Sequence, residues 1–240
     1  MSSYVVTGAA RGIGLEFVRQ LSADSNNTVF ALVRNKGTAT ELNDLSRNNI
    51  ILAANEVSKA TNGKLDYLIS NAGKTNHPGL TIDQLSNSSS ISLLVLLFSW
   101  FKTNTIGAVH CTNAFLPLLK NGSVKKVICI SSGLGDSDVT VATQAVGEPS
   151  YSISKAALNM VVAKYAAQYK ADGFTFLALS PGMVKTSMLP TARFAPDFKG
   201  PITPEKSVKM QLEVINRWTV EESGALCLIS GTNNGFSAKG

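Results

Sequence analysis

The chain has 240 residues, a length that suits one α/β domain and can bury a sizeable hydrophobic core. Hydrophobic residues make up 44% of it and charged residues 16%, a balance that excludes a disordered, solvating chain. The net charge of +6 comes from scattered lysines and arginines without an aromatic and basic platform, so the sequence does not predict nucleic-acid binding.

A glycine-rich turn follows the first predicted strand, at 3–7. The turn is Thr7-Gly8-Ala9-Ala10-Arg11-Gly12-Ile13-Gly14, and a helical pattern over 12–23 overlaps its end. In this setting the backbone amides and the helix N-terminus face a pyrophosphate, and the glycines let the phosphates approach. Glycines that only shape a tight turn are the alternative, since their spacing differs from the Gly-x-Gly-x-x-Gly form. We expect the dinucleotide to contact Gly8, Arg11, Gly12, Ile13 and Gly14.

The end of the second predicted strand, at 28–33, indicates which dinucleotide is bound. An acidic residue about 20 positions beyond the glycine turn would bind a ribose 2′-hydroxyl and repel a 2′-phosphate. This chain has Arg34 there, with no Asp or Glu near it, and Arg11 adds a second cation. Because a planar guanidinium can bind a phosphate bidentately, the sequence favours NADP(H) over NAD(H). The alternative is that Arg34 is a solvated residue after a strand.

Strand-like runs alternate with helical patterns along the whole chain. The predicted strands lie at 3–7, 28–33, 49–53, 65–70, 124–131, 173–180 and 225–230. The predicted helices lie near 12–23, 38–47, 81–119 in pieces, 150–170 and 203–218. This alternation is typical of a Rossmann-type doubly wound parallel sheet in three layers, here one NAD(P)-binding domain over 1–240. Ligands bind at the carboxyl ends of such strands, and we expect a substrate loop near 187–203.

Tyr151 and Lys155 are four residues apart at the start of the helix predicted over 150–170. That spacing places both side chains on one helical face, where the ammonium can lower the pKa of the phenol. A tyrosine tuned in this way is a general acid. The pair alone is a weak signal, because the same spacing occurs by chance on solvated helix faces.

Five motifs in this order resemble the short-chain dehydrogenase/reductase family over most of the chain. The glycine-rich turn is the first, and the others are Asn71-Ala72-Gly73, Ser131-Ser132, Tyr151 with Lys155, and Pro181-Gly182. The resemblance is to the carbonyl-reductase-like and fungal ketoreductase branch, which includes norsolorinic acid ketoreductase. It implies hydride transfer between NADP(H) and a small carbonyl or alcohol substrate.

The resemblance also implies a role for each matching residue. Tyr151 would donate a proton to the substrate carbonyl oxygen, and Ser132 would donate a hydrogen bond to it. Lys155 would bind ribose hydroxyls and lower the pKa of Tyr151, and Asn104 would hold a water beside the lysine. A capping role for Ser132 and an exposed position for Asn104 are the structural alternatives. Tyr151 and Lys155 also count among the cofactor contacts, and the others are Asn71, Ala72, Gly73, Pro181, Gly182, Val184 and Thr186.

Three segments depart from the family pattern. The connection between Leu52 and Leu65 is short, so we expect residues 48–64 to be the least stable part of the sheet and the adenine pocket to be open there. The run from Ile91 to Phe101 is unusually apolar but too short for a membrane span, so we expect a buried helix. The C-terminal segment from Gly231 to Gly240 has the composition of a polar, glycine-rich tail.

Cys111, Cys129 and Cys227 lie in apolar surroundings without metal-ligand spacing. We expect buried free thiols in a reducing compartment, no bound metal, and a cytoplasmic protein without a secretion signal. A homo-oligomer formed through the helices near 95–119 and 150–170 is an option that the sequence leaves open.

The first functional hypothesis is an NADPH-dependent reductase of a ketone or aldehyde, with polyketide and aromatic ketones among the substrate classes. The alternative is a catalytically idle protein of the same fold that binds a nucleotide or a protein partner. The four residues Ser132, Tyr151, Lys155 and Asn104 favour the enzyme, because a binding module has no need of the full set. The three departures favour the alternative.

Overall fold

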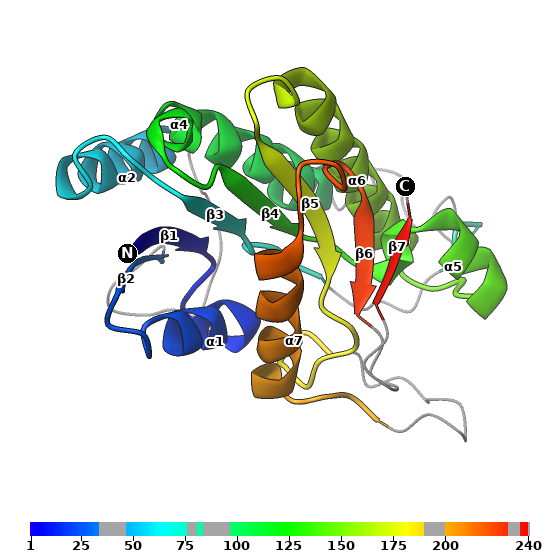
Figure 1. The fold of residues 1–240 in the computed structure, drawn as a ribbon. Coiled ribbons are helices and arrows are strands. Elements are labelled where there is room, and N and C mark those ends of the chain that lie inside the picture. Colours follow the sequence, from blue (N-terminus) through cyan, green and yellow to red (C-terminus); the bar gives the residue numbers. More distant parts are fainter. Residues whose placement is uncertain (34–46, 76–80, 84–96, 190–199, 230–235, 240) are drawn as a thin grey trace.

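The computed structural model describes residues 1–33, 47–75, 81–83, 97–189, 200–229 and 236–239, whose strands form one seven-stranded sheet (Figure 1). The strands are β1 Ser2–Thr7, β2 Asn27–Leu32, β3 Tyr67–Ser70, β4 Lys126–Ile130, β5 Thr175–Ser180, β6 Leu226–Ile229 and β7 Phe236–Lys239. Their order is β2-β1-β3-β4-β5-β6-β7, and β7 alone among them is antiparallel to its neighbour.

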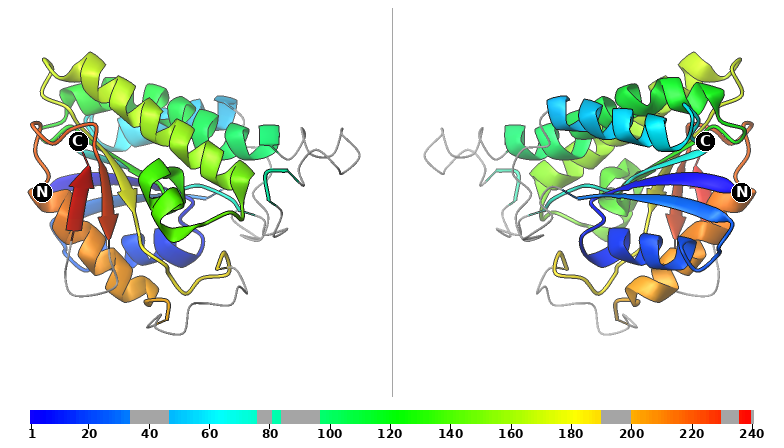
Figure 2. Two further views of the ribbon diagram at one scale, coloured as in Figure 1. Left: turned by 90° about the vertical axis from the view of Figure 1, so that its right-hand side faces the viewer. Right: turned by 90° about the vertical axis from the view of Figure 1, so that its left-hand side faces the viewer.

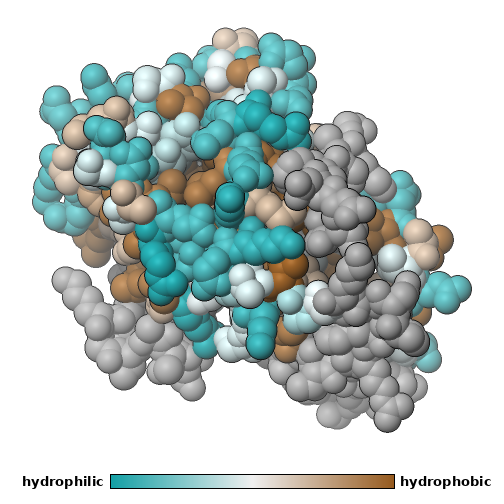
Figure 3. Space-filling view, turned by 60° about the horizontal axis from the view of Figure 1, so that its bottom comes forward, coloured by the Kyte–Doolittle hydropathy of each residue, from teal (hydrophilic) through white to brown (hydrophobic). Residues whose placement is uncertain are grey.

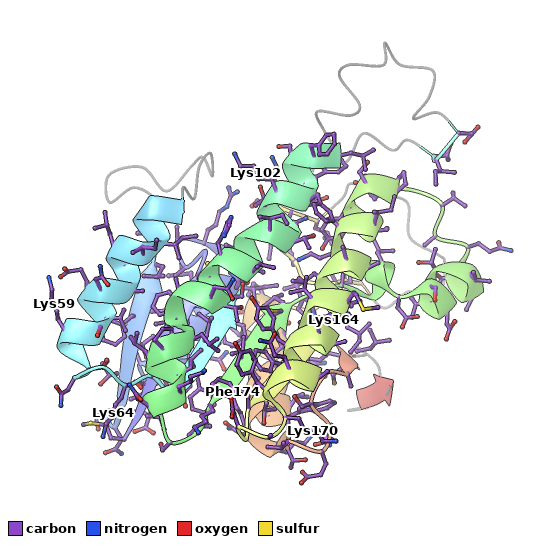
Figure 4. All side chains as sticks on the ribbon, turned by 90° about the horizontal axis from the view of Figure 1, so that it is seen from above. Lys59, Lys64, Lys102, Lys164, Lys170 and Phe174 are labelled. Atoms are coloured by element: carbon purple, nitrogen blue, oxygen red, sulfur yellow. The ribbon has the colours of Figure 1, made fainter. Side chains whose placement is uncertain are left out.

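Helices cover both faces of this sheet and make three layers (Figure 2). One face carries α1 Gly12–Leu21 and α7 Pro204–Arg217. The other carries α2 Arg47–Ala60, α4 Gly107–Asn121 and α6 Pro149–Tyr169, which lie side by side (Figure 4). A π-helical turn, η2 Lys102–Ile106, leads into α4, while η3 Gly133–Gly135 and α5 Ser137–Thr143 follow β4. The described chain has the Rossmann-type α/β fold that the sequence predicts.

Two hydrophobic cores lie between the layers, because the central strands are apolar on both sides. In β4, Val127 and Cys129 face the core under α2, α4 and α6, while Ile128 and Ile130 face the core under α1 and α7. Side chains alternate along a strand, so a strand buried on both faces is a continuous apolar run. The sequence therefore identifies the strands of this kind readily.

The strand predicted at 49–53 is wrong, since these residues lie within helix α2. Ile50, Ala54 and Val57 are buried in the core against α4, and their spacing of four and three residues has the helical period. A short apolar run such as 50–54 fits both patterns, so periodicity alone does not distinguish them. The helix predicted near 38–47 lies outside the described residues, apart from Arg47 at the start of α2.

Both edges of the sheet differ from the expectation. With residues 48–60 in α2, β2 is the edge strand within the described part of the chain, and the prediction that 48–64 are a weak part of the sheet loses its basis. At the other edge, the C-terminal segment contributes β7, which pairs with β6 from Ile229↔Phe236 to Leu226↔Lys239. The expectation of a polar tail is therefore wrong for residues 236–239.

Asp66 ties together the amino ends of two strands and a loop. Its carboxylate accepts hydrogen bonds from the backbone N–H and the hydroxyl of Ser3, both at 2.9 Å. It also accepts from the backbone N–H of Ser123 at 3.0 Å and from the Ser123 hydroxyl at 2.8 Å. Next to it, the rings of Tyr4 and Tyr67 stack with centroids 4.4 Å apart. This cluster stabilises the sheet at the amino ends of β1 and β3, opposite to the carboxyl ends where the predicted motifs lie.

The three cysteines are buried with free thiols, as the sequence predicts. Of the apolar run 91–101, residues 97–101 are described, and they are helical with Trp100 buried and Phe98 exposed. Within the described residues, no helix is long and apolar enough to cross a membrane, and no group of His, Cys, Asp or Glu side chains is arranged to hold a metal ion.

The lysines of the helical layer are dispersed over its surface. The labelled lysines of Figure 4 are spread across the helical layer from α2 to α6 instead of forming one patch. Seen from below in Figure 3, hydrophilic side chains gather across the middle of the molecule, with apolar side chains visible in separate groups between them. This distribution agrees with the scattered lysines and arginines of the sequence.

Candidate active site

The predicted motifs converge at the carboxyl ends of the parallel strands. The chain runs from β1 outward to β2 and then crosses to β3 on the other side of β1, so the strand order reverses between β1 and β3. Gly8 follows β1, Asn71 follows β3, Ser131 follows β4 and Pro181 follows β5. A reversal of strand order is where open α/β sheets bind ligands.

The glycine turn packs directly on the segment after β3. Gly8 has φ +65°, and a Cβ atom there would lie 2.9 Å from the Ala72 Cα. A Cβ atom on Gly14 would lie 2.4 Å from both the Gly8 carbonyl oxygen and the Asn71 Nδ2. The Asn71 amide donates to the carbonyl oxygens of Thr7 at 3.0 Å and Gly8 at 3.2 Å. Only glycine fits these two positions, and the Asn71 side chain holds the turn in shape.

The N-terminus of α1 has the form of an anion-binding site. Arg11 precedes the helix in an extended conformation and is exposed, and its side chain makes no capping hydrogen bond. Helix α1 therefore presents its first backbone amides, with the positive end of the helix dipole, at the reversal point of the sheet. Gly12, Ile13 and Gly14 are the first residues of α1, and their backbone amides are suited to binding a pyrophosphate. Arg34 lies outside the described residues.

The segment after β5 lies opposite the glycine turn. The Thr186 Cγ2 would be 3.5 Å from a Cβ atom on Gly12, so the two segments face each other at close range. The Pro181 carbonyl oxygen accepts a hydrogen bond from the Ser207 hydroxyl at 2.7 Å, and Gly182 has φ +77°. Val184 forms an isolated bridge with Ile202. The structure thus brings Thr186 close to Gly12, and Asn71 and Ala72 close to Gly8.

Asn104 lies in the π-helical turn η2 and is buried, so the alternative of an exposed asparagine is wrong. Its Oδ1 accepts from the backbone N–H of Lys74 at 2.9 Å, and its Nδ2 donates to the Lys74 carbonyl oxygen at 3.0 Å. The same Nδ2 donates to the Ser154 hydroxyl at 3.0 Å, and that hydroxyl donates to the Tyr151 carbonyl oxygen at 2.7 Å. Asn104 therefore joins the segment after β3 to the helix that carries Tyr151.

Tyr151 and Lys155 lie near the start of α6, with the lysine Nζ 5.7 Å from the centroid of the tyrosine ring. Lys155 is buried, and its Nζ donates to the Ile130 carbonyl oxygen at 2.8 Å. A Cβ atom on Gly73 would lie 3.7 Å from this Nζ and 3.3 Å from the Asn104 Oδ1. The amide, the ammonium and the glycine backbone thus meet beside the phenol.

The pKa of Tyr151 differs from the sequence expectation. Burial raises it to about 12, although a hydrogen bond with the Ser132 side chain works in the opposite direction. Burial also lowers the pKa of Lys155 to about 8, which the neighbouring Cys129 thiol partly opposes. Desolvation disfavours the charged form of each group, and it is the largest cause of both shifts. The prediction that Lys155 leaves Tyr151 with a lowered pKa is therefore wrong for this chain.

Ser132 leads the turn η3, directly after β4. Its hydroxyl accepts a hydrogen bond from the backbone N–H of Leu134 at 3.2 Å, which is the capping role named as the alternative. The same side chain is in hydrogen-bond contact with the Tyr151 phenol, so capping and contact with the tyrosine occur together. Ser132, Tyr151, Lys155 and Asn104 form one connected cluster of side chains.

Sequence patterns missed three residues of this site. Lys74 is buried enough that its pKa is lowered, an effect to which Lys102 adds, and it contacts the Ser99 hydroxyl. Ser154 connects Asn104 with Tyr151, and Asn159 contacts the turn that holds Ser132. Helical spacing is the one available signal, since Ser154 and Asn159 lie three and eight residues beyond Tyr151.

The sequence profile of the short chain dehydrogenase family, adh_short, matches residues 3–195. The chain belongs to the short-chain dehydrogenase/reductase family. The short-chain dehydrogenase/reductase atnB of Arthrinium sp is 41% identical over 258 aligned positions, which cover 93% of this chain and 96% of atnB. The short chain dehydrogenase virK of Hypocrea virens is 39% identical over 268 positions, covering 98% of each chain.

Solved structures agree with this membership. The NADPH-bound carbonyl reductase from chicken fatty liver superimposes with a TM-score of 0.81 at 33% sequence identity, covering 95% of this chain and 96% of that enzyme. Membership in the short-chain dehydrogenase/reductase family makes the chain an oxidoreductase of the carbonyl-reductase-like kind with a nicotinamide cofactor.

Proposed function

We propose that this short-chain dehydrogenase/reductase reduces a ketone or aldehyde carbonyl to an alcohol with NADPH. The observation that carries the proposal is the connected cluster at the carboxyl ends of the strands. There the Tyr151 phenol contacts Ser132, and Lys155 lies beside it. Asn104 is linked through Ser154 to the backbone carbonyl of Tyr151. A protein that only binds nucleotide has no need for a proton donor, a hydrogen-bond donor and a cation in this arrangement.

Tyr151 is the proton donor of the proposed reaction. Bound NADPH supplies a hydride to the carbonyl carbon, and the phenol gives its proton to the carbonyl oxygen. A pKa raised to about 12 keeps this phenol protonated at neutral pH, which suits an acid in the reductive direction. Ser132 donates a hydrogen bond to the same oxygen and stabilises the negative charge that develops there.

Lys155 and Asn104 prepare the site around the tyrosine. With a pKa of about 8, Lys155 is mostly protonated at neutral pH, so its ammonium can stabilise the phenolate left after proton transfer. The same ammonium can donate to ribose hydroxyls of the cofactor. Asn104 fixes the backbone of Lys74 next to Gly73, and so holds this segment close to the Lys155 ammonium.

NADPH is the proposed cofactor on the strength of two arginines. Arg11 stands exposed before α1, and Arg34 follows Val33 at the end of β2 in the sequence. Both are suited to the 2′-phosphate, since guanidinium binds phosphate bidentately. The carbonyl reductase from chicken fatty liver, a relative at 33% identity, has NADPH bound, which supports the choice.

For the substrate, we propose an aromatic or polyketide-type ketone. The support is the resemblance of the sequence motifs to the fungal ketoreductase branch, together with exposed apolar side chains after β4 and β5. Val141 and Val146 follow Ser132, and Met183 follows Pro181, and all three are exposed. The loop 187–203 is proposed to contact the substrate, and its residues 190–199 lie outside the described part of the chain. The chain is proposed to act as one cytoplasmic domain.

An NADPH-oxidation assay against a panel of carbonyls tests the proposal. The panel should combine aromatic ketones, aliphatic ketones and aldehydes, and the Tyr151→Phe variant serves as the matched control. We expect turnover of at least one aromatic ketone by the wild-type chain and its loss in the variant. Tight NADPH binding without turnover of any carbonyl would instead favour the alternative, a catalytically idle nucleotide-binding protein.

A further inference from the structure

The first serine of the Ser131-Ser132 pair has a contact that the proposed reaction does not use. Ser131 is buried, and its hydroxyl donates a hydrogen bond to the Asn159 Oδ1 at 2.6 Å. The Asn159 Nδ2 donates to the Gly135 carbonyl oxygen at 3.1 Å. One amide side chain on α6 therefore joins both ends of the turn that carries Ser132.

The turn also lies against the backbone of α6 with no space between them. A Cβ atom on Gly135 would lie 2.7 Å from the Lys155 carbonyl carbon and 2.8 Å from the Ala156 nitrogen. Glycine at 135 is what permits this approach. The turn therefore sits on the stretch of helix that holds Lys155.

From the other side, the turn is held by the end of β5. The backbone N–H of Gly133 donates to the Ser180 hydroxyl at 3.0 Å, and that of Ser131 donates to the Leu179 carbonyl oxygen at 2.8 Å. These two hydrogen bonds connect the turn to β5 and not to α6. Apart from the contact of Ser132 with Tyr151, the turn is tied to α6 by the Asn159 amide and by the packing of Gly135.

Asn159 lies on the same face of α6 as the two catalytic residues. Tyr151, Lys155 and Asn159 follow each other at intervals of four residues, which places them one turn apart in a row. The helix thus carries the proton donor, the cation and the amide that holds the serine turn. A shift of about 1 Å in a reacting group can lower a rate by about 100-fold, so the position of Ser132 relative to Tyr151 has a large effect.

We propose that Asn159 is a positioning residue that sets the place of the Ser132 hydroxyl beside Tyr151. The inference rests on the proposed reductase function and adds a residue to it. Asn159 touches neither the substrate nor the cofactor in this role. It acts by hydrogen bonds to Ser131 and Gly135, on either side of the serine.

The first test compares Asn159→Ala with Asn113→Ala. Asn113 is the matched control, because its Oδ1 accepts one helix-to-helix hydrogen bond from the Tyr165 hydroxyl at 2.6 Å, away from the serine turn. We expect Asn159→Ala to lower kcat by roughly 10- to 100-fold while the Kd for NADPH changes less than twofold. Asn113→Ala should retain the wild-type kcat. A wild-type kcat in Asn159→Ala would overturn the proposal.

A double-mutant cycle separates positioning from a general loss of stability. If Asn159 acts through Ser132, adding Asn159→Ala to Ser132→Ala should cause little further loss in the single-turnover rate. Ser131→Ala should reproduce part of the Asn159→Ala effect, because it removes one of the two hydrogen bonds. Rate losses that multiply in the double variant would show that Asn159 acts independently of Ser132, and the proposal would be rejected.

Hydrogen exchange supplies a readout that does not depend on activity. If the wild-type chain reduces no carbonyl of the panel, the proposed function fails, but the amides of residues 133–136 still report on the turn. We expect them to exchange at least about tenfold faster in Asn159→Ala than in wild type or Asn113→Ala. Unchanged exchange would overturn the assignment of Asn159 whatever the enzyme assay shows.

Discussion

Burial acts in opposite directions on the two ionisable groups of the site. The phenol of Tyr151 has its pKa raised to about 12, and the ammonium of Lys155 has its pKa lowered to about 8. Both shifts favour the neutral form, because desolvation penalises whichever form is charged. The pair therefore favours a protonated tyrosine, which is the form needed to donate a proton to a carbonyl oxygen.

Replacing Tyr151 by phenylalanine removes only the phenolic hydroxyl, and so tests whether this group is the proton donor. We expect Tyr151→Phe to lower kcat by about 10²–10⁴-fold, the usual contribution of a general acid, and to leave the Kd for NADPH within twofold. Lys155→Ala should reduce both quantities, because the ammonium serves the ribose and the phenolate. Steady-state kinetics and fluorescence titration measure them. Substantial turnover in Tyr151→Phe would exclude Tyr151 as the acid.

Arg34 tests the cofactor preference. We expect Arg34→Asp to weaken NADPH binding by at least about tenfold, because a carboxylate would repel the 2′-phosphate and can bind the 2′-hydroxyl of NADH instead. The affinity for NADH should stay the same or increase, and it acts as the internal control. Titration of both cofactors by fluorescence gives the ratio. An equal loss for the two would mean that Arg34 has a structural role.

At the end of the sheet opposite the active site, α4 packs tightly against the segment before β3. The end of α4 lies on the segment before β3, where the Leu65 N–H donates to the Leu118 carbonyl oxygen at 3.0 Å. Gly122 caps α4, and a Cβ atom there would lie 1.9 Å from the Leu65 carbonyl oxygen. The approach of helix to strand therefore depends on the absence of a side chain at one position.

Gly122→Ala should separate α4 from the segment before β3. We expect it to lower the free energy of unfolding by roughly 1–3 kcal/mol, as overpacking of this kind does. Gly147→Ala is the matched control, because a Cβ atom at Gly147 has no neighbour within 4 Å and should change stability by less than about 0.5 kcal/mol. Urea denaturation followed by circular dichroism measures both. Equal stability of the two variants would contradict the packing argument.

The Asp66 cluster should make stability depend on pH. Burial works to raise the pKa of Asp66, but the hydrogen bonds from Ser3 and Ser123 outweigh it and hold the pKa below the ordinary value of 3.8. The stabilisation by this carboxylate is therefore present above the unfolded-state pKa and is lost as the pH falls through the folded-state pKa.

Asp66→Asn removes this dependence. At pH 7 we expect the variant to be less stable than wild type by roughly 1–3 kcal/mol, because its amide cannot accept all four hydrogen bonds. Between pH 7 and pH 3 the wild-type chain should lose more stability than the variant does. Urea midpoints at the two pH values give the comparison, and parallel losses would show that Asp66 does not contribute.

At the level of the whole molecule, α6 and the helical segment at residues 97–101 carry exposed apolar side chains. Ile153 and Met160, seven residues apart on one face of α6, are 47% and 60% exposed. Phe98 and Phe101, at the start of the helical segment before α4, are also exposed. Exposed apolar side chains on neighbouring helices are typical of a surface that another protein chain covers. We propose that a second copy of this chain covers it.

Met160→Glu tests this association. We expect the wild-type chain to run as an oligomer in size-exclusion chromatography with light scattering, and the variant to shift towards the monomer. Leu52→Glu is the matched control, since Leu52 is 61% exposed on α2, away from this surface. It should leave the oligomer intact. A monomeric wild-type chain, or an equal shift in both variants, would contradict the prediction.

Features that are local or strongly patterned could be predicted from the amino-acid sequence. The glycine turn, the strands buried on both faces and the helix with Tyr151 and Lys155 each depend on residues close together in the chain, and the structure has them where the sequence predicts. Motif order along the chain was also enough to bring Asn71, Ser132 and Pro181 to one edge, because the carboxyl ends of parallel strands meet there.

Only the tertiary structure decided the features that depend on distant neighbours. Residues 47–60 are a helix because α4 offers Ile50, Ala54 and Val57 a surface at helical spacing, whereas the short apolar run also fits a strand. The pKa of Tyr151 is raised because surrounding residues exclude water, which the four-residue spacing to Lys155 does not reveal. Asn159 contacts the serine turn through residues 24 and 28 positions away, so its place emerges only when α6 packs on η3.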